Sequence, residues 1–244
     1  MRVLILGGTT EASQLAVKAS TIEGIEVIVS LAGRTSQPAK IHVPTRIGGF
    51  SGTEGLVTYL RNNAIALLID ATHPFAAQIS FNGAIAAKIC GIPHLMLVRP
   101  PWQPIKGDRW IEVNDFKAAV AVLPGLAKRV FLAIGRQELA AFSYLEDIWF
   151  LMRTIEPPAS DKPIPKGHLL LERGPFDLTE ERQLLKKYQI EAIVSKNSGG
   201  EATIAKIIAA RELGLPAVII KRPIMPEGDR VTDVDSAFKW IIGN

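Results

Sequence analysis

The sequence has little cysteine and no long hydrophobic run, and each shortage excludes a class of protein. Among 244 residues there is one cysteine, Cys90, so no disulfide can form within the chain and a buried structural thiol is the expected role. No apolar stretch approaches the roughly 20 residues that a membrane-spanning helix needs. The short apolar start ends in glycines and is not typical of a signal peptide. We therefore expect a cytoplasmic protein without membrane contact.

Paired metal ligands and polybasic segments are also lacking. The four histidines are scattered without the paired spacing of zinc sites, so we expect no bound metal. Lysine and arginine number 28 against 24 acidic residues, which gives a net charge of +4 spread along the chain. Because no basic run interleaves with aromatic residues, this balance favours a small anionic molecule over a nucleic acid as the partner. The sequence indicates nothing about the oligomeric state.

Short β-branched runs alternate with helical stretches along the chain, which is typical of parallel sheets covered by helices. We expect strands at residues 3–6, 26–30, 45–47, 66–70, 94–98, 110–113, 130–134, 149–154, 169–172, 192–195 and 218–220. Helices are expected at residues 11–19, 53–62, 78–90, 115–123, 138–144, 179–188, 201–213 and 234–242. The pattern predicts an α/β fold with two Rossmann-like lobes, each a parallel sheet with flanking helices, and an active-site cleft between them.

A stretch rich in proline, residues 99–108, interrupts this alternation. It holds three prolines and a glycine, and proline removes backbone donors that a continuing strand would need. We place the boundary there, with a nucleotide-binding lobe at residues 1–103 and a substrate-binding lobe at residues 104–244. The final helix could pack on either lobe.

The turn after the first strand has the composition of an anion site. It consists of Gly7, Gly8, Thr9, Thr10 and Glu11. Glycines let a phosphate approach the main chain, and the N-terminus of the following helix favours negative charge. The turn lacks the G-x-G-x-x-G fingerprint, so a plain tight turn is the alternative, with Glu11 merely complementing the helix dipole.

The end of the second strand bears on the choice of dinucleotide. An acidic residue there would favour NAD. This chain has no carboxylate there and instead presents Ser30, Gly33, Arg34 and Thr35. Hydroxyls and a guanidinium suit a 2′-phosphate, so we expect NADPH, with a solvated loop cation as the alternative for Arg34. Gly49 and Phe50 follow the third strand and offer a further approach to the cofactor, or merely a turn.

The fourth strand ends in a turn that contains Thr72, His73 and Pro74. In α/β proteins ligands bind beyond the carboxyl ends of strands, so we expect these residues at the cofactor. His73 could donate a proton to a substrate or have a structural role.

Cations recur after strands of the second lobe. Arg136, Arg173 and Lys196 each stand at such a position, and Lys196 lies in a run with Ser195, Asn197 and Ser198. Together these residues would attract a polycarboxylate, although each alone has the ordinary alternative of a surface side chain. Lys196 is a second candidate proton donor, and solvent is a third source.

Six segments taken together resemble the precorrin-6A reductase family. They are residues 7–11, residues 70–76 with Ser80 and Asn82, residues 99–102, residues 135–136, residues 172–176 and residues 195–200. The resemblance covers essentially the whole chain in order. It implies transfer of a hydride from NADPH to a ring double bond of a tetrapyrrole in corrin biosynthesis. In that frame residues 8–10 hold phosphates, residues 72–74 the nicotinamide, and the second-lobe cations the substrate carboxylates.

Alternatives remain at this point. The family resemblance includes enzymes for metal-free and for cobalt-loaded substrates, the latter with NADH, and no residue here separates the two. A non-catalytic NADP-binding regulator would need the first lobe only. A short-chain dehydrogenase is disfavoured because none of the three tyrosines has a lysine four positions later.

Overall fold

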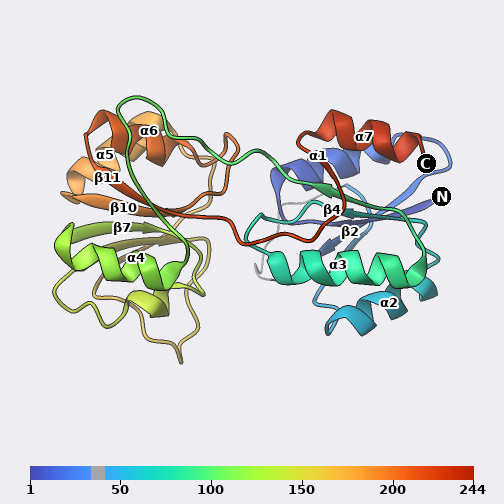
Figure 1. The fold of residues 1–244 in the computed structure, drawn as a ribbon, viewed down its shortest axis with the longest axis horizontal. Coiled ribbons are helices and arrows are strands. Elements are labelled where there is room, and N and C mark those ends of the chain that lie inside the picture. The colour runs from blue at the N-terminus through green and yellow to red at the C-terminus, as the bar shows by residue number, and fades with distance from the viewer. Residues whose placement is uncertain (34–41) are drawn as a thin grey trace. The chain divides into compact units, whose positions relative to one another are not determined.

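The computed structural model describes residues 1–33 and 42–244 of the chain. They form two compact units: unit 1 comprises residues 1–100 and 223–244, and unit 2 comprises residues 101–222 (Figure 1). Each unit contains one six-stranded parallel sheet with flanking helices, so the predicted α/β fold is confirmed. The position of residues 223–244 differs from the expected assignment of 104–244 to the second lobe, because this segment adds a strand and a helix to unit 1.

The strands of unit 1 have the order β12-β5-β4-β1-β2-β3. They are β1 (Arg2–Leu6), β2 (Glu26–Leu31), β3 (Thr45–Ile47), β4 (Leu67–Asp70), β5 (His94–Leu97) and β12 (Asp229–Val231). This is the spatial order of a doubly wound dinucleotide-binding sheet, in which the direction of winding reverses between β1 and β4. Ligands of such sheets bind beyond the carboxyl ends of the strands at this switch point.

Helices cover both faces of the unit 1 sheet. They are α1 (Thr10–Ala19), α2 (Thr53–Asn62), α3 (Ala77–Cys90) and α7 (Val234–Ile242). Val3 and Ile5 of β1 pack in one core with α1 and α7, whereas Leu4 and Leu6 pack in another with α2 and α3 (Figure 1). Successive side chains of a strand point to opposite faces, so a strand covered on both sides must be apolar throughout.

Unit 2 repeats this arrangement with a different edge strand. Its order is β6-β11-β10-β7-β8-β9. The strands are β6 (Arg109–Val113), β7 (Arg129–Ala133), β8 (Trp149–Thr154), β9 (Gly167–Leu171), β10 (Ala192–Lys196) and β11 (Pro216–Ile220). Counted from β7, the order matches that of unit 1 counted from β1, and the second switch point lies between β7 and β10. The sixth strand precedes the others in unit 2 and follows them in unit 1.

Most helices of unit 2 are shorter than the sequence pattern indicates, and one has the expected ten residues. They are α4 (Phe116–Val122), α5 (Leu178–Lys187) and α6 (Ala205–Glu212), with the 3-10 helices η1 (Leu123–Gly125) and η2 (Leu139–Phe142). The helix expected at residues 138–144 is only the four-residue η2, and α6 begins four residues later than expected. None of the described helices is long and apolar enough to cross a membrane.

Replacing Ile241 by alanine tests the docking of the C-terminal segment. Ile241 of α7 is fully buried in the core of unit 1, so Ile241→Ala should lower the free energy of unfolding by about 2 to 5 kcal/mol. The neighbouring Ile242 is 56% exposed, and Ile242→Ala should change it by less than about 0.5 kcal/mol. Chemical denaturation followed by circular dichroism measures both, and equal losses would contradict the packing of α7.

His94 opens β5 and places an imidazole against the core of unit 1. Its Nε2 is buried without a hydrogen-bond partner among the described residues. Burial lowers the pKa of His94 below the ordinary value, although the carboxylates of Asp70 and Asp229 act in the opposite direction. The unfolded state therefore binds the proton more readily than the folded state.

This pKa difference predicts a pH-dependent stability of unit 1. The contribution of His94 is complete above the ordinary histidine pKa of about 6.5 and is lost as the pH falls below it. The free energy of unfolding should fall when the pH is lowered from about 7.5 to about 5.5, and this fall should be smaller in His94→Gln than in the unchanged protein. The exposed His168 gives a control, because His168→Gln should keep the full pH dependence. Identical profiles for all three proteins would exclude this role of His94.

Candidate functional site

The turn between β1 and α1 leaves an open helix N-terminus at the switch point of unit 1. Gly8 has a φ of +116°, which side-chain-bearing residues rarely adopt, and apart from its chain neighbours no heavy atom of the described residues lies within 4 Å of the position that a Cβ would take. The first N–H groups of α1, those of Thr10 and Glu11, have no partner within the helix. The local main chain therefore has the space and the donors that a phosphate group requires.

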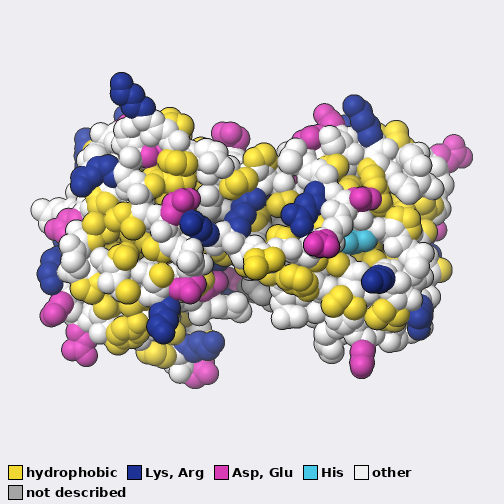
Figure 2. Space-filling view, in the orientation of Figure 1, with side chains coloured by type: hydrophobic (Ala, Val, Ile, Leu, Met, Phe, Trp, Pro, Cys, Tyr) yellow, Lys and Arg dark blue, Asp and Glu magenta, His cyan; other side chains and the backbone are white. Residues whose placement is uncertain are grey.

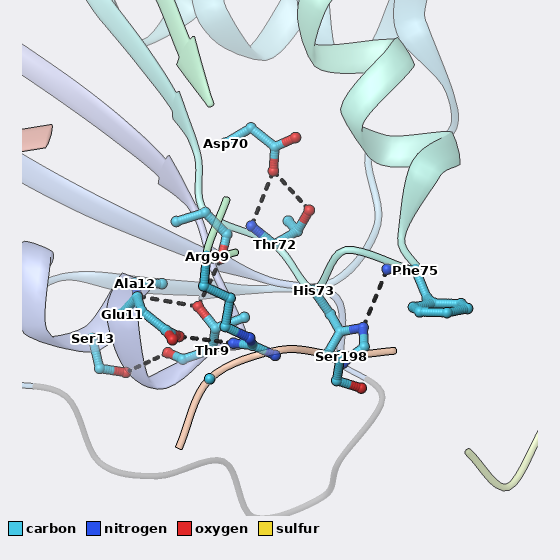
Figure 3. A network of polar contacts seen from close by, with 12 residues as sticks. Thr9, Glu11, Ala12, Ser13, Asp70, Thr72, His73, Phe75, Arg99 and Ser198 are labelled. Carbon is cyan, nitrogen blue, oxygen red and sulfur yellow. Dashed lines mark hydrogen bonds and ion pairs between the residues drawn. The ribbon is translucent and has the colours of Figure 1, made fainter. Parts of the chain in front are cut away.

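Thr9 fixes this turn. Its Oγ1 accepts a hydrogen bond from the N–H of Ala12 at 3.1 Å and donates one to the carbonyl of Ala71 at 2.8 Å. The first bond caps α1, and Figure 3 shows it together with the bond from Ser13 to the Thr9 carbonyl. The second bond joins the turn after β1 to the turn after β4. Thr9 is thus a positioning residue, and its hydroxyl is already engaged.

Glu11 forms an ion pair that the sequence analysis did not anticipate. Its Oε2 lies 2.9 Å from Nη1 of Arg99, and both side chains are largely buried (Figure 3). Arg99 stands two residues beyond β5, so the pair joins the first turn of α1 to the carboxyl edge of the sheet. Arg99 brings positive charge to the open helix N-terminus, where Glu11 alone would repel a phosphate. Its position just after a strand was the sequence feature that could have marked Arg99 as a site residue.

Asp70 organises the turn after β4. It is 1% exposed, and its Oδ1 accepts hydrogen bonds from the N–H of Thr72 at 3.0 Å and the hydroxyl of Thr72 at 2.7 Å (Figure 3). The same hydroxyl lies 3.5 Å from Oγ of the fully buried Ser80. Thr72 is therefore oriented by groups on two elements, and it holds the chain that leads into His73.

His73 is oriented by its own turn. Its Nδ1 accepts a hydrogen bond from the N–H of Phe75 at 3.2 Å, and its carbonyl accepts one from Ala76 at 2.7 Å. A ring nitrogen that accepts carries no proton, so the proton of the neutral imidazole is on Nε2. The Phe75 ring lies 5.9 Å from the imidazole and adds an apolar neighbour. This geometry presents Nε2 as the donor of His73.

Ser30 at the end of β2 meets a residue that the sequence analysis missed. Its Oγ accepts a hydrogen bond from Nη1 of Arg46 at 3.0 Å, and the two residues are paired in the β2–β3 ladder. The guanidinium of Arg46 also donates to the carbonyl of Gly49 and lies over the ring of Phe50. Ser30, Gly49 and Phe50 are therefore brought together by Arg46.

Two further expected cofactor residues, Arg34 and Thr35, lie outside the described part of the chain. Gly33, the last described residue before them, has a φ of +70°. The backbone conformation of Gly33 is therefore one that favours glycine.

An ion pair occupies the switch point of unit 2. Nζ of Lys196, at the end of β10, lies 3.2 Å from Oε1 of Glu138, and both side chains are mostly buried. Gly135 follows β7 beside them, and a Cβ there would stand only 2.5 Å from Oε2 of Glu138. The missing side chain at residue 135 thus allows the carboxylate to approach Lys196. Sequence reasoning identified Lys196 but gave no sign of Glu138 as its partner.

The other two expected substrate cations also have acidic neighbours. Arg136 forms an ion pair with Glu156 at 3.1 Å and donates to the carbonyl of Pro157 at 3.0 Å. Arg173 lines a pocket of unit 2 that also contains Glu172 and other charged side chains. On the visible face of each unit, basic and acidic side chains are interspersed (Figure 2). The expected cluster of positive charge is therefore partly compensated within unit 2.

Asn197 and Ser195 have structural contacts. The side-chain amide of Asn197 accepts a hydrogen bond from the N–H of Trp102 at 2.8 Å and donates one to its carbonyl at 3.0 Å. The carbonyls of Asn197 and Ser198 accept bonds from Arg222. Ser195 is 1% exposed and donates to the carbonyl of Lys196. These contacts shape the loop that carries Lys196.

The described residues contain no group of three or more His, Cys, Asp and Glu side chains placed to hold a metal ion. The groups available for binding are instead main-chain N–H donors, hydroxyls, one oriented imidazole and several cations. Such groups suit phosphates and carboxylates.

Replacing Asn197 by alanine separates a structural role from substrate binding. Asn197→Ala would leave the N–H and carbonyl of Trp102 unpaired in a buried place, so the free energy of unfolding should fall by about 2 to 4 kcal/mol. The exposed Asn114 is a matched control, and Asn114→Ala should change it by less than about 0.5 kcal/mol. Unchanged thermal and chemical stability of Asn197→Ala would return the residue to the list of substrate ligands.

Comparison with known proteins gives these contacts a family context. The family model described as "Precorrin-6x reductase CbiJ/CobK" matches residues 2–242. A precorrin-6A reductase of Rhodobacter capsulatus is 45% identical over 240 residues, which cover 98% of this chain and 95% of that protein. A cobalt-precorrin-6A reductase of a Synechocystis species is 31% identical and covers 95% of this chain and 92% of that protein.

A solved structure agrees with the sequence comparisons. The structure named CobK precorrin-6A reductase has a TM-score of 0.94 and 44% identity, and the match covers 100% of this chain and 96% of that one. Sequence and fold thus agree along both units, and the chain belongs to the precorrin-6x reductase family.

Proposed function

We propose that this protein is an NADPH-dependent reductase of the cytoplasm that reduces one ring double bond of precorrin-6A during cobalamin biosynthesis. The observation that carries the proposal is the open N-terminus of α1 at the switch point of unit 1, in a chain of this family. The product is the dihydro form of the macrocycle. The hydride and the proton that add across the double bond come from NADPH and from an acid.

The residues of unit 1 fit the phosphates and the nicotinamide of a dinucleotide. Gly7, Gly8 and the N–H groups of Thr10 and Glu11 would hold the pyrophosphate, with Arg99 supplying positive charge. Thr72, His73 and Pro74 would lie at the nicotinamide end, because they follow β4 on the same sheet edge. When bound, NADPH supplies a hydride to the substrate. The protein's task is to hold the two reactants in register and to exclude water.

His73 is our candidate for the acid. In its doubly protonated form, His73 would give up the hydrogen bond that Nδ1 accepts from the N–H of Phe75 at 3.2 Å, and donation of the Nε2 proton would then leave a neutral imidazole. Lys196 is held by Glu138 and suits a different task, the binding of a substrate carboxylate. Arg136 and Arg173 would bind further carboxylates, and Arg136 would exchange part of its contact with Glu156 for one of them.

The metal-free substrate is favoured over the cobalt-loaded one. Identity to the precorrin-6A reductase of R. capsulatus is 45%, against 31% to the cobalt-precorrin-6A reductase of Synechocystis. The difference lies in sequence similarity alone and points to no single residue. A direct test offers both substrates to the purified protein under anaerobic conditions and follows the oxidation of NADPH and of NADH. Oxidation only with the cobalt substrate, or only of NADH, would overturn the corresponding part of the proposal.

The division of labour between His73 and Lys196 predicts distinct kinetics. His73→Ala should lower kcat by about 100- to 10,000-fold with little change in the Kd for NADPH, as expected on loss of a general acid. Lys196→Met should mainly raise the KM for the tetrapyrrole, because a binding contact is removed. The exposed His168 is the control, and His168→Ala should keep both constants. A large kcat loss in Lys196→Met with normal turnover of His73→Ala would reverse the two roles.

A further inference from the structure

Arg46 is held in one orientation at the outer strand of the unit 1 sheet. Its Nη1 donates to Oγ of Ser30 at 3.0 Å and to the carbonyl of Gly48 at 2.7 Å, and its Nη2 donates to the carbonyl of Gly49 at 2.7 Å. The guanidinium lies 3.8 Å from the centre of the Phe50 ring. Three hydrogen bonds and one stacked face leave this side chain little rotational freedom.

The charge of Arg46 is not balanced by a carboxylate among the described residues. Every bond that it donates ends on a neutral oxygen, whereas Arg99 and Arg136 form ion pairs with Glu11 and Glu156. A guanidinium has five N–H donors, and three are used here. The bond of Nη2 to Gly49 is solvent-exposed, so solvent and ligands can reach this part of the guanidinium. Such a fixed and uncompensated guanidinium is suited to an anion.

The place of Arg46 in the sheet indicates which anion. Arg46 is paired with Ser30 at the carboxyl end of β2, where doubly wound sheets meet the adenosine ribose. NADPH differs from NADH only by a phosphate on the 2′-oxygen of that ribose. We infer that Arg46 is a residue that selects NADPH: the edge of its guanidinium would bind the 2′-phosphate while the Phe50 ring supports one face. This inference rests on the proposed function and adds a specificity residue to it.

The inference gives Ser30 a role different from direct contact with the phosphate. The Ser30 side chain is 5% exposed, so it contacts Arg46 from within the sheet and does not need to reach the ligand itself. Ser30 then acts as a positioning residue that aims the guanidinium. The carbonyls of Gly48 and Gly49 do the same from the following loop.

The test compares two substitutions that both remove the guanidinium of Arg46 but differ in charge. Arg46→Gln and Arg46→Lys both lose the planar fork that spans Ser30, Gly48 and Gly49, and only the lysine variant keeps a cation. The Kd values for NADPH and NADH are measured by calorimetry for each, and folding is checked by circular dichroism. The probes 2′,5′-ADP and 5′-AMP repeat the comparison without the nicotinamide. Arg61→Gln, at the C-terminal end of α2, is the control for loss of an arginine from this unit.

We expect Arg46→Gln to weaken the binding of NADPH and 2′,5′-ADP by about 10- to 100-fold, the usual effect of a lost charged hydrogen bond, and to leave the binding of NADH and 5′-AMP unchanged. Arg46→Lys should lose less affinity for NADPH. If the glutamine variant does not fold, a reduced preference of the lysine variant for NADPH over NADH supports the inference. Equal losses for both dinucleotides, or an unchanged preference, would overturn it and leave the proposed function intact. Failure of the unchanged protein to bind either dinucleotide would instead remove the proposed function.

Discussion

Parallel pairing of every strand in each sheet is the constraint on which all the candidate residues depend. Because parallel strands end at the same edge, the turns after β1, β2, β4 and β5 meet there, although they are far apart in the sequence. The hydrogen bond from Thr9 to the carbonyl of Ala71 and the ion pair of Glu11 with Arg99 hold three of these turns together. The geometry of the edge is thus set by contacts between turns and not by one motif.

The two units share a strand order but offer different chemistry at their switch points. In unit 1 a ten-residue helix follows the first turn, so main-chain N–H groups and the helix dipole supply the positive field. In unit 2 only the four-residue η2 follows the corresponding turn, and its dipole is too short to do the same. In unit 2 the charges at the switch point are instead those of side chains, namely Lys196 and Glu138. We therefore propose the first edge for the dinucleotide and the second for the carboxylates of the substrate.

Acidic partners partly neutralise two of the cations of unit 2 that were expected to bind the substrate. Lys196 and Arg136 each face a glutamate, which fixes their orientation and reduces the field that a substrate would meet. A carboxylate that binds there must compete with these partners, so selectivity rests on matching several positions at once. Arg46 is the contrasting case, because its hydrogen-bond partners among the described residues are neutral oxygens.

Much of this protein could be read from local sequence. The alternation of apolar strands with amphipathic helices determined the α/β class, since burial on both faces of a sheet requires continuous apolar strands such as β11. Gly8, His73 and Lys196 were identifiable because each stands at or just after the end of a strand. In each case the strand and the turn residue lie within a few positions of each other in the sequence, so no tertiary contact is needed to recognise them.

Only the tertiary structure decided the rest. The strand β12 is three residues long with two charged side chains, so its pattern is too weak to predict, and its pairing with β5 depends on residues more than 130 positions away in the chain. The partners of Lys196 and Arg99, and Ser30 as a partner of Arg46, likewise come from other elements, and no spacing in the sequence indicates them. Residue type determined which groups carry charge, whereas strand order determined which of those charges are compensated and which remain for a ligand.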